Sequence, residues 1–406
     1  MSTLTQTQSA SGGENRPDTT SDAPFLVFGA PCIGDEEIAE VVATIESRWL
    51  GTGPRAAQFE EDFRTYKAAS HAVAVNSCTA ALHLALIALD LQPGDEVITT
   101  PLTFASTVNA IIHAGGTPIL ADVDPRTMNL APAAVSAAIS PRTRAILPVH
   151  FAGRACEMDS LIDLADQHSL DIIEDCAHAI ETVYHGRPAG TMGRFGCFSF
   201  YVTKNLTTAE GGMLLTSAQD DADRLRILAL HGMSKDAWKR FSDDGYRHYY
   251  VVEAGFKYNM TDLQAAFGLQ QLRKVEQFRQ QRQHIWDAYL EGLAGLPVTL
   301  PAPFEPDTQH ALHLFTIRID SDRSPVTRDE FLDEMTRHRI GVGVHYLSIP
   351  EHPFYQERFN WHPLDVPEAA RIGRETVSLP LMPSMTDTDV SRVISAVRAI
   401  LRGQVS

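Results

Sequence analysis

The alternation of strand-like and helix-like patterns between residues 71 and 216 is the feature that most constrains this fold. Runs such as "HAVAV", "VITTP", "GTPILADVD", "TRAILPVHFAG", "LDIIEDCAHA", "CFSFY" and "GGMLLTS" read as strands, and several are separated by helical stretches such as "TAALHLALIALDL" and "MDSLIDLADQHS". Strands that alternate with helices predict an α/β fold with a mixed, mainly parallel sheet covered on both faces. Ligands of such sheets bind beyond the carboxyl ends of the strands.

The second half of the chain predicts a connector and a smaller domain. A long amphipathic stretch over residues 262–295 has no strand signal and ends at Gly-Leu-Pro. Beyond it, "HLFTIRID" and "VGVHYL" read as strands, and "TRDEFLDEMTRHRI" and "TDTDVSRVISAVRAILRG" as helices. We therefore expect a large domain over residues 24–285, including the connecting helix, and a small C-terminal α/β domain over residues 286–406. Residues 1–23 are rich in Ser, Thr, Gly and Gln and are expected to be disordered.

Charge and cysteine usage exclude several classes of protein. The formal net charge is −17, which disfavours nucleic acid and anionic membranes as partners because both need a basic surface. No apolar run approaches the roughly 20 residues that span a bilayer, and the N-terminus lacks a signal-peptide pattern. The five cysteines form no CxxC pair, which argues against a disulfide framework and a metal site. We expect a cytoplasmic protein with reduced cysteines.

One lysine, Lys204, follows the apolar run in "GCFSFYVTKNLTTAEGGMLLT". Burial in apolar surroundings lowers the pKa of a lysine, so that its neutral amine can condense with a carbonyl group. The alternative is a surface lysine whose stem lies along the protein while its ammonium stays in water. The position after a buried strand favours the first interpretation.

Two further segments place polar groups at strand ends. In "AVAVNSCTAALHLAL" a strand runs into hydroxyl residues that open a helix, which exposes backbone amides for an anion; Ser77 or Thr79 could instead only cap that helix. In "LDIIEDCAHA", Asp175 ends a hydrophobic strand and needs a cationic or hydrogen-bonding partner there. It could hold a protonated heterocyclic nitrogen, or form a structural ion pair or helix cap. His178 follows three residues later, and on its own reads as a partly buried histidine.

Taken together, ten motifs in order resemble one family. They are "RWLGTGP", "NSCTAALHLAL", "TPLTFASTVNAI", "DVDP", "LPVHFAG", "IIEDCAHA", "FSFYVTKNLTTAEGGM", "GFKYNMTDLQAAFGL", "VGVHYL" and "SLPLMPSMTD". From about Pro24 to the C-terminus the chain resembles the DegT/DnrJ/StrS family of sugar aminotransferases, which depend on pyridoxal 5′-phosphate (PLP). The resemblance implies the aspartate-aminotransferase-like fold, known as fold type I among PLP enzymes.

The resemblance also implies the roles of four residues around the cofactor. Lys204 would form the internal aldimine with PLP and later shuttle the proton between the cofactor and the sugar carbon. Asp175 would pair with the pyridine nitrogen, which makes the ring an electron sink. His178 matches a position, often Gln in relatives, that contacts the phenolic oxygen of the cofactor. Phe104 matches the aromatic residue that stacks on the cofactor ring.

The phosphate of the cofactor is expected at the start of the helix in "NSCTAALHLAL". By resemblance it is held by the Cys78 and Thr79 backbone, the Thr79 hydroxyl and Ser199. Lys257 stands where many relatives have an Asn that reaches the phosphate across a dimer interface, and would add a charged contact from the partner subunit. Ala209 replaces a common Gly and should alter loop flexibility more than chemistry.

For the sugar nucleotide, the resemblance points to two segments and the residues suggest a third. The first two are Trp49, Leu50, Gly51 and Thr52 of "WLGT", and His345 and Tyr346 of "VHYL"; each could instead serve packing. The run "HGMSKDAWKRF" contributes Lys235, Lys239 and Arg240, which could bind a diphosphate or simply form a solvated face.

The function that the resemblance implies has two half-reactions. L-glutamate leaves its nitrogen on the cofactor, and a nucleotide-linked keto sugar, a UDP- or dTDP-4-keto-6-deoxyhexose, takes it up. A homodimer with shared active sites is expected. The alternatives are a sugar 3-dehydratase, in which histidine replaces the lysine, a non-catalytic regulator that keeps the fold, and a cyclitol aminotransferase.

Overall fold

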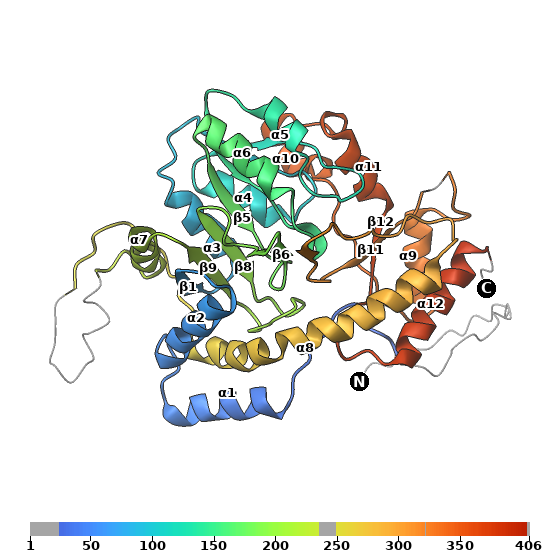
Figure 1. The fold of residues 1–406 in the computed structure, drawn as a ribbon, viewed down its shortest axis with the longest axis horizontal. Helices are drawn as coiled ribbons and strands as arrows, with labels where there is room; N and C mark the ends of the chain where they lie inside the picture. The colour runs from blue at the N-terminus through green and yellow to red at the C-terminus, as the bar shows by residue number, and fades with distance from the viewer. Residues whose placement is uncertain (1–23, 235–248, 321, 404–406) are drawn as a thin grey trace, which may run out of the picture.

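A seven-stranded sheet forms the centre of the computed structural model, which describes residues 24–234, 249–320 and 322–403 (Figure 1). The strands are β1 (His71–Val75), β2 (Glu96–Thr99), β3 (Thr117–Leu120), β4 (Thr143–Leu147), β5 (Asp171–Asp175), β8 (Phe195–Ser199) and β9 (Gly212–Thr216), in the order β1-β9-β8-β5-β4-β2-β3. β9 pairs antiparallel with β1 and β8, whereas the other neighbours pair parallel. The predicted mixed, mainly parallel sheet is confirmed.

Helices cover both faces of this sheet. On one face lie α3 (Cys78–Ile87), α4 (Ala105–His113) and α7 (Gln219–Ala229), and on the other α2 (Pro54–Tyr66), α5 (Pro132–Ala138), α6 (Met158–His168) and the first half of α8 (Asp262–Leu293). Successive strand side chains point to opposite faces. In β1, Val73 and Val75 join the first core, whereas Ala72 and Ala74 join the second. Strands buried on both faces explain why their sequences are almost continuously apolar.

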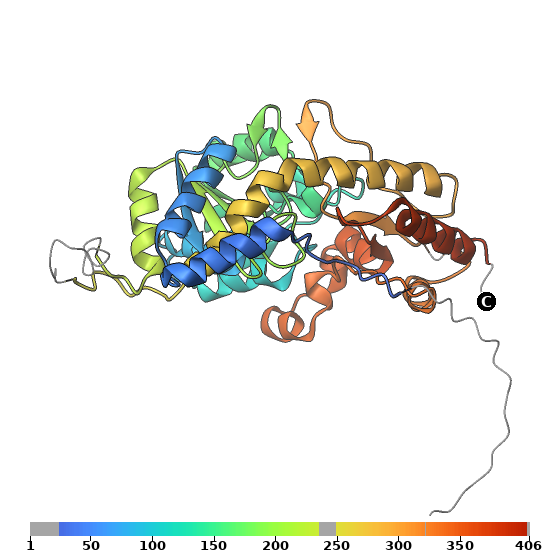
Figure 2. The ribbon, with the colours of Figure 1, turned by 90° about the horizontal axis from the view of Figure 1, so that it is seen from below.

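The long helix α8 joins two hydrophobic cores. It begins with a capping box, in which the Thr261 hydroxyl accepts the amide of Gln264 and the Gln264 side chain accepts the amide of Thr261. Its first half packs under the sheet, and from Ile285 to Leu293 it packs into the C-terminal core. Figure 1 shows α8 running from beneath the sheet to the part that carries α9 and α12, and Figure 2 shows α1 (Asp35–Ser47) lying across it.

The C-terminal part contains a two-stranded antiparallel sheet of β11 (Phe315–Arg318) and β12 (Thr376–Leu379). Around it lie α9 (Arg328–Arg337), α11 (Pro367–Glu375), α12 (Asp387–Leu401) and the 3-10 turn η4 (Pro363–Asp365). The 3-10 turn η3 (Ile349–Glu351) and α10 (Pro353–Phe359) pack instead against α4. The predicted strand in "VGVHYL" is wrong. β12, which the sequence did not predict, takes the place beside β11, and residues 342–347 form a loop with a single bridge from Gly343 to Ser378.

The described chain starts with an arm on the C-terminal part. Leu26 exchanges backbone hydrogen bonds with Arg339 (2.9 Å) and Gly341 (2.8 Å) before the chain crosses to α1. A small sheet of β10 (Thr308–Gln309), β6 (Val183–Tyr184) and β7 (Arg187–Pro188) and the turn η1 (Phe151–Gly153) complete the described structure. None of the helices in the described ranges is long and apolar enough to cross a membrane. The expected disordered tail, residues 1–23, lies outside the described residues.

Candidate active site

The carboxyl ends of β1, β5 and β8 open onto one cavity of about 500 Å³. Of the residues that the sequence analysis selected, its lining contains Cys78, Thr79, Phe104, Asp175, His178, Ser199, Lys204, His345 and Tyr346. These residues come from segments up to 268 positions apart, counted from Cys78 to Tyr346. The sheet brings them together because parallel strands end at the same edge.

Lys204 lies at the edge of this cavity, on the loop between β8 and β9. Its backbone amide donates to the carbonyl of Tyr201 (2.9 Å), which closes a turn. Burial lowers the pKa of the amine to about 8, although the nearby Cys78 and Asp175 act in the opposite direction. A neutral amine is therefore accessible near physiological pH, as the apolar setting of the motif predicts.

After the loop that carries Lys204, the backbone at the start of β9 passes close to the backbone at the start of α3. A Cβ on Gly212 would lie 2.5 Å from the carbonyl carbon of Ser77, so only glycine lets β9 pass this turn. Ala209 has a φ of 65°. This left-handed conformation costs a non-glycine residue about 1–2 kcal/mol.

Asp175 is buried at the carboxyl end of β5 with a partner for each oxygen. The Ala177 amide donates to Oδ1 (3.1 Å) and the Thr107 hydroxyl donates to Oδ2 (2.9 Å). Burial raises the pKa of this carboxyl, while the two hydrogen bonds and the charge of Lys204 counteract that rise. Within the described ranges Asp175 has no ion pair, so the site offers a buried carboxylate to a cation.

The neighbouring Glu174 points to the other face of the sheet and has a structural role. It accepts the amides of Gly190 (2.8 Å) and Gly193 (2.7 Å) and contacts His150 Nε2 (3.0 Å). Because side chains alternate along a strand, only Asp175 of the two carboxylates faces the cavity.

The start of α3 presents two free amides to the cavity. The Ser77 hydroxyl caps the helix by accepting the Ala80 amide (3.1 Å). Among the described residues, neither the Cys78 nor the Thr79 amide has a hydrogen-bond partner. Unpaired amides at a helix N-terminus favour an anion such as a phosphate. The Ser199 hydroxyl lines the same cavity.

Phe104 caps the start of α4 and is 61% exposed although it lines the cavity. A large aromatic side chain this exposed inside a cavity is available to stack on a planar ligand. Its ring lies 6.1 Å from that of Tyr346.

A hydrogen-bonded histidine cluster forms the opposite wall. His178 Nε2 lies 3.0 Å from the Tyr346 hydroxyl, and the His178 ring contacts the His313 ring in a tilted arrangement with centroids 4.4 Å apart. His313 is held by Asn205, whose amide reaches Glu181 (2.9 Å). Sequence reasoning missed His313 and Asn205 because both lie behind the cavity lining.

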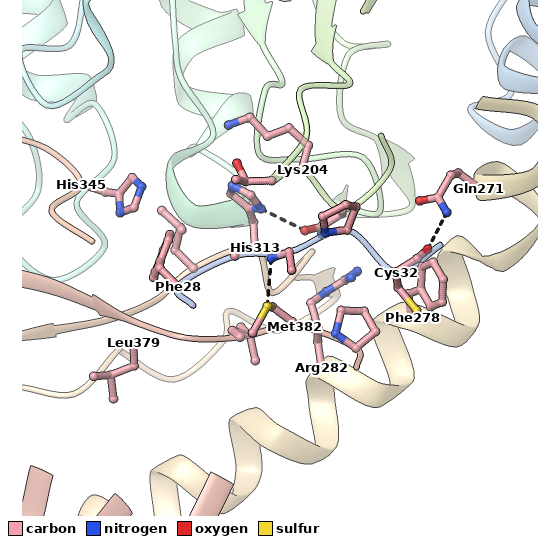
Figure 3. Close-up of a pocket in the computed structure, with 18 residues that line it drawn as sticks. Phe28, Cys32, Lys204, Gln271, Phe278, Arg282, His313, His345, Leu379 and Met382 are labelled. Carbon is pink, nitrogen blue, oxygen red and sulfur yellow. Dashed lines mark hydrogen bonds between the residues drawn. The ribbon is translucent and has the colours of Figure 1, made fainter. Parts of the chain in front are cut away.

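Behind Lys204 is a second, smaller cavity of about 60 Å³. Figure 3 shows Lys204, His313 and His345 around it, with Arg282 of α8 on its lower side. The amino end of Lys204 points away from Arg282. Arg282 is buried and forms an ion pair with the buried Glu181. Lys204 therefore lines both cavities, and the smaller one lies between α8 and the loop that carries Lys204.

Five of the selected residues lie outside the larger cavity. Trp49, Leu50, Gly51, Thr52 and Lys257 do not line it in the same chain. The turn that contains Thr52 is tied to the start of α8, because the Thr52 hydroxyl donates to the Met260 carbonyl (2.5 Å). Trp49 is 52% exposed, and Lys257 is exposed as well. Lys235, Lys239 and Arg240 lie outside the described residues.

Sequence reasoning missed Thr107, which lines the cavity. Its hydroxyl donates a hydrogen bond to Asp175 and so holds that carboxylate in place. A signal existed. Thr103, Ser106 and Thr107 cluster around Phe104 at the start of a helix, and all three line the cavity.

The chain is similar to known proteins over almost its whole length. Residues 31–398 match the DegT/DnrJ/EryC1/StrS aminotransferase family. The spore coat polysaccharide biosynthesis protein SpsC of Bacillus subtilis is 47% identical over 380 residues, which cover 93% of this chain and 98% of SpsC.

Solved structures of two similar proteins contain the cofactor or a reaction intermediate. A protein of Streptococcus pneumoniae described as a sugar aminotransferase has been solved in forms with PLP and with its aminated form, PMP. The PMP form is 30% identical, with a TM-score of 0.87 over 93% of this chain and 98% of that one. DesV of S. venezuelae, in complex with a ketimine intermediate, is 34% identical with a TM-score of 0.83, covering 93% and 98% of the two chains.

These similarities, added to the fold, make the protein a PLP-dependent sugar aminotransferase. The chain belongs to the DegT/DnrJ/EryC1/StrS aminotransferase family. Its cofactor is PLP. The fold predicted from the resemblance is confirmed.

Proposed function

We propose that the protein transfers an amino group from L-glutamate to a nucleotide-linked keto sugar, a UDP- or dTDP-4-keto-6-deoxyhexose. The observation that carries the proposal is that the Lys204 amine, the Asp175 carboxylate and the free amides of α3 surround one cavity of about 500 Å³. The residues present fit PLP, since a buried carboxylate without an ion pair and two unpaired amides match its ring nitrogen and phosphate. When bound, PLP supplies a carbon that accepts an amine and a ring that withdraws electrons.

In this proposal the phosphate end of the cofactor lies at the start of α3. The Cys78 and Thr79 amides bind the phosphate oxygens, and the Thr79 and Ser199 hydroxyls donate to them. The ring then extends toward β5, where Asp175 holds the protonated nitrogen, and Phe104 stacks on its face. Thr107 keeps the Asp175 carboxylate oriented through its hydroxyl (2.9 Å).

Lys204 moves the protons. With its pKa lowered to about 8, the Nζ atom can take a proton and release it within one cycle. It takes the proton that leaves the α-carbon of the amino donor. It would deliver that proton to the cofactor carbon, and in the second half-reaction it would take a proton from the cofactor carbon and deliver it to the sugar carbon that receives nitrogen.

The sugar is proposed to bind on the side of His345 and Tyr346, both of which line the cavity. Trp49, Leu50, Gly51 and Thr52 reach a sugar nucleotide only if another chain completes the site, because they lie outside the cavity of their own chain. Likewise, Lys257 would reach the cofactor phosphate only from another chain, because it lies outside the cavity of its own chain. A homodimer with shared active sites accounts for both groups.

The surface supports such a dimer. On α1, the apolar side chains Ile38, Val42 and Ile45 are exposed at helical spacing, and Trp49 and Leu50 continue the apolar patch. Contiguous exposed apolar side chains favour a protein interface. A cytoplasmic location is also proposed, since all five cysteines are free thiols and thiols stay reduced there.

Mixing inactive subunits tests the shared site. We expect Lys257→Ala subunits and Lys204→Ala subunits to be inactive or weak alone, and to regain activity when mixed, because one site of the heterodimer then has both lysines. The measurement is amino transfer by purified heterodimers carrying two different tags. Verified heterodimers without any regain would show that Lys257 does not act across the interface.

The substrates are tested by following the absorption of the bound cofactor. L-glutamate should convert the PLP form to the PMP form, and one ketosugar from a panel of UDP- and dTDP-linked 4-keto and 3-keto sugars should convert it back. L-alanine and free keto sugars serve as controls. Return with a cyclitol ketone in place of every nucleotide sugar would contradict the proposal.

A further inference from the structure

The direction of the hydrogen bonds around His178 can be derived from its partners. The Ala152 backbone amide donates to His178 Nδ1 (3.2 Å). A backbone amide cannot accept, so Nδ1 carries no proton and the proton of the neutral ring is on Nε2. Burial, with the charge of Lys204 adding to it, holds the pKa of His178 well below its ordinary value. The ring is therefore neutral, and its Nε2–H donates to the Tyr346 oxygen (3.0 Å).

The ring of His178 is fixed in this orientation by a second layer. The His313 ring packs against it in a tilted arrangement with centroids 4.4 Å apart, and the His313 Nδ1 atom is hydrogen-bonded to the Asn205 side-chain oxygen (2.9 Å). The Asn205 amide nitrogen in turn donates to the Ala311 carbonyl (2.8 Å) and to Glu181 (2.9 Å). The Asn205 amide cannot be turned over without losing the bonds to Ala311 and Glu181, because its oxygen would then face two acceptor oxygens.

These directions leave the proton of Tyr346 free. Its oxygen already accepts from His178, and no other partner of this hydroxyl is found in the described part of the chain. Burial raises the pKa of Tyr346, with Asp175 adding to that rise, so the hydroxyl keeps its proton. Tyr346 lines the larger cavity. The hydroxyl therefore presents an O–H donor to an occupant of that cavity.

The placement of the cofactor in the proposed function, on which this inference rests, selects the acceptor. A PLP ring anchored at its phosphate by α3, at its nitrogen by Asp175 and at its reactive carbon by Lys204 has its phenolic oxygen on the side away from the phosphate. His178 and Tyr346 line the same cavity as Asp175 and Lys204. We propose that Tyr346 donates a hydrogen bond to the phenolic oxygen of PLP, and that His178 is a positioning residue that acts through Tyr346.

This differs from the role that the family resemblance implies for His178, which is direct contact with that oxygen. In the structure the single N–H of His178 is engaged by Tyr346. The other titratable groups that face the pair are Asp175, Lys204, His313 and His345.

The test is the pH titration of the absorption band of bound PLP, with the dissociation constant of PLP from equilibrium dialysis as a second measurement. A donor to the phenolic oxygen stabilises the deprotonated form of the bound cofactor, so removing it should raise the midpoint. For Tyr346→Phe we expect a rise of about one pH unit and affinity about tenfold weaker, as for loss of a charge-assisted hydrogen bond. His178→Gln keeps an N–H donor, so its titration midpoint and its affinity for PLP should stay near the wild-type values.

Two further variants separate the explanations. Tyr289→Phe removes a buried hydroxyl that donates to the Pro380 carbonyl (2.8 Å) far from the cavity, and should change neither measurement. His178→Leu should shift the midpoint less than Tyr346→Phe does. A larger shift in His178→Leu, with Tyr346→Phe unchanged, would overturn the inference in favour of direct contact by His178. Wild-type protein that fails to bind PLP would overturn the proposed cofactor site as well.

Discussion

Replacing Lys204 with alanine is expected to abolish amino transfer, lowering kcat/KM by about 10⁴-fold or more, at the upper end of what a general acid–base group contributes. The effect depends on the position of the Lys204 amine as much as on its lowered pKa. Lys204 is the amine that lines the cavity together with Asp175, and its amino end points away from Arg282 of α8. Without it no described side chain of the site can carry the proton between the two carbon atoms. The measurement is the single-turnover absorbance change with L-glutamate.

Lys67 provides a matched control for this experiment. It is also buried, and burial lowers its pKa to about 8 as well. Its amine, however, donates to the Ile180 carbonyl (2.7 Å) and does not line the cavity. Lys67→Met should lower the thermal midpoint of unfolding but leave the rate per folded site within a few fold. Near-normal turnover in Lys204→Ala would remove this residue from the mechanism.

The sheet could be predicted from the sequence because each of its signals is local. A strand buried on both faces is a short apolar run, and "HAVAV" or "GMLLT" shows that directly. The C-terminal part was harder. "VGVHYL" has the residue types of a strand, but its place beside β11 is taken by β12, a competition between distant segments that no local pattern records.

The candidate site likewise contains residues that the sequence predicted and residues that it did not. Residues that end a strand, lie in the loop after a strand or open a helix, such as Asp175, Lys204 and Thr79, were selected from the sequence and do line the cavity. Thr107 and His313 were missed because their contacts come from helix and loop packing. Trp49 and Lys257 lie outside the cavity of their own chain, and their roles stay predictions that depend on a second chain.

Asp175→Asn is the substitution with the second-largest expected effect. Asparagine keeps the size of the side chain and an oxygen that can accept from Thr107 or Ala177, but it removes the negative charge. In a buried site that charge is what keeps a ring nitrogen protonated. We expect kcat/KM to fall by about 10²–10³-fold, the 3–4 kcal/mol that removing one preorganised electrostatic partner costs. Steady-state kinetics at saturating PLP measures it.

The adjacent residue separates loss of charge in the cavity from loss of a buried carboxylate in general. Glu174→Gln removes a carboxylate that is equally buried and only one position away, but that holds the Gly190–Gly193 loop on the other face of the sheet. We expect this variant to unfold at a lower temperature, because a neutral acceptor replaces a charged one. Its turnover per folded site should be largely kept. If Asp175→Asn instead stayed within threefold of wild-type turnover, the cofactor ring would have to lie elsewhere in the cavity. If both variants lost turnover alike, the effect would come from disruption of β5 rather than from the charge that Asp175 presents.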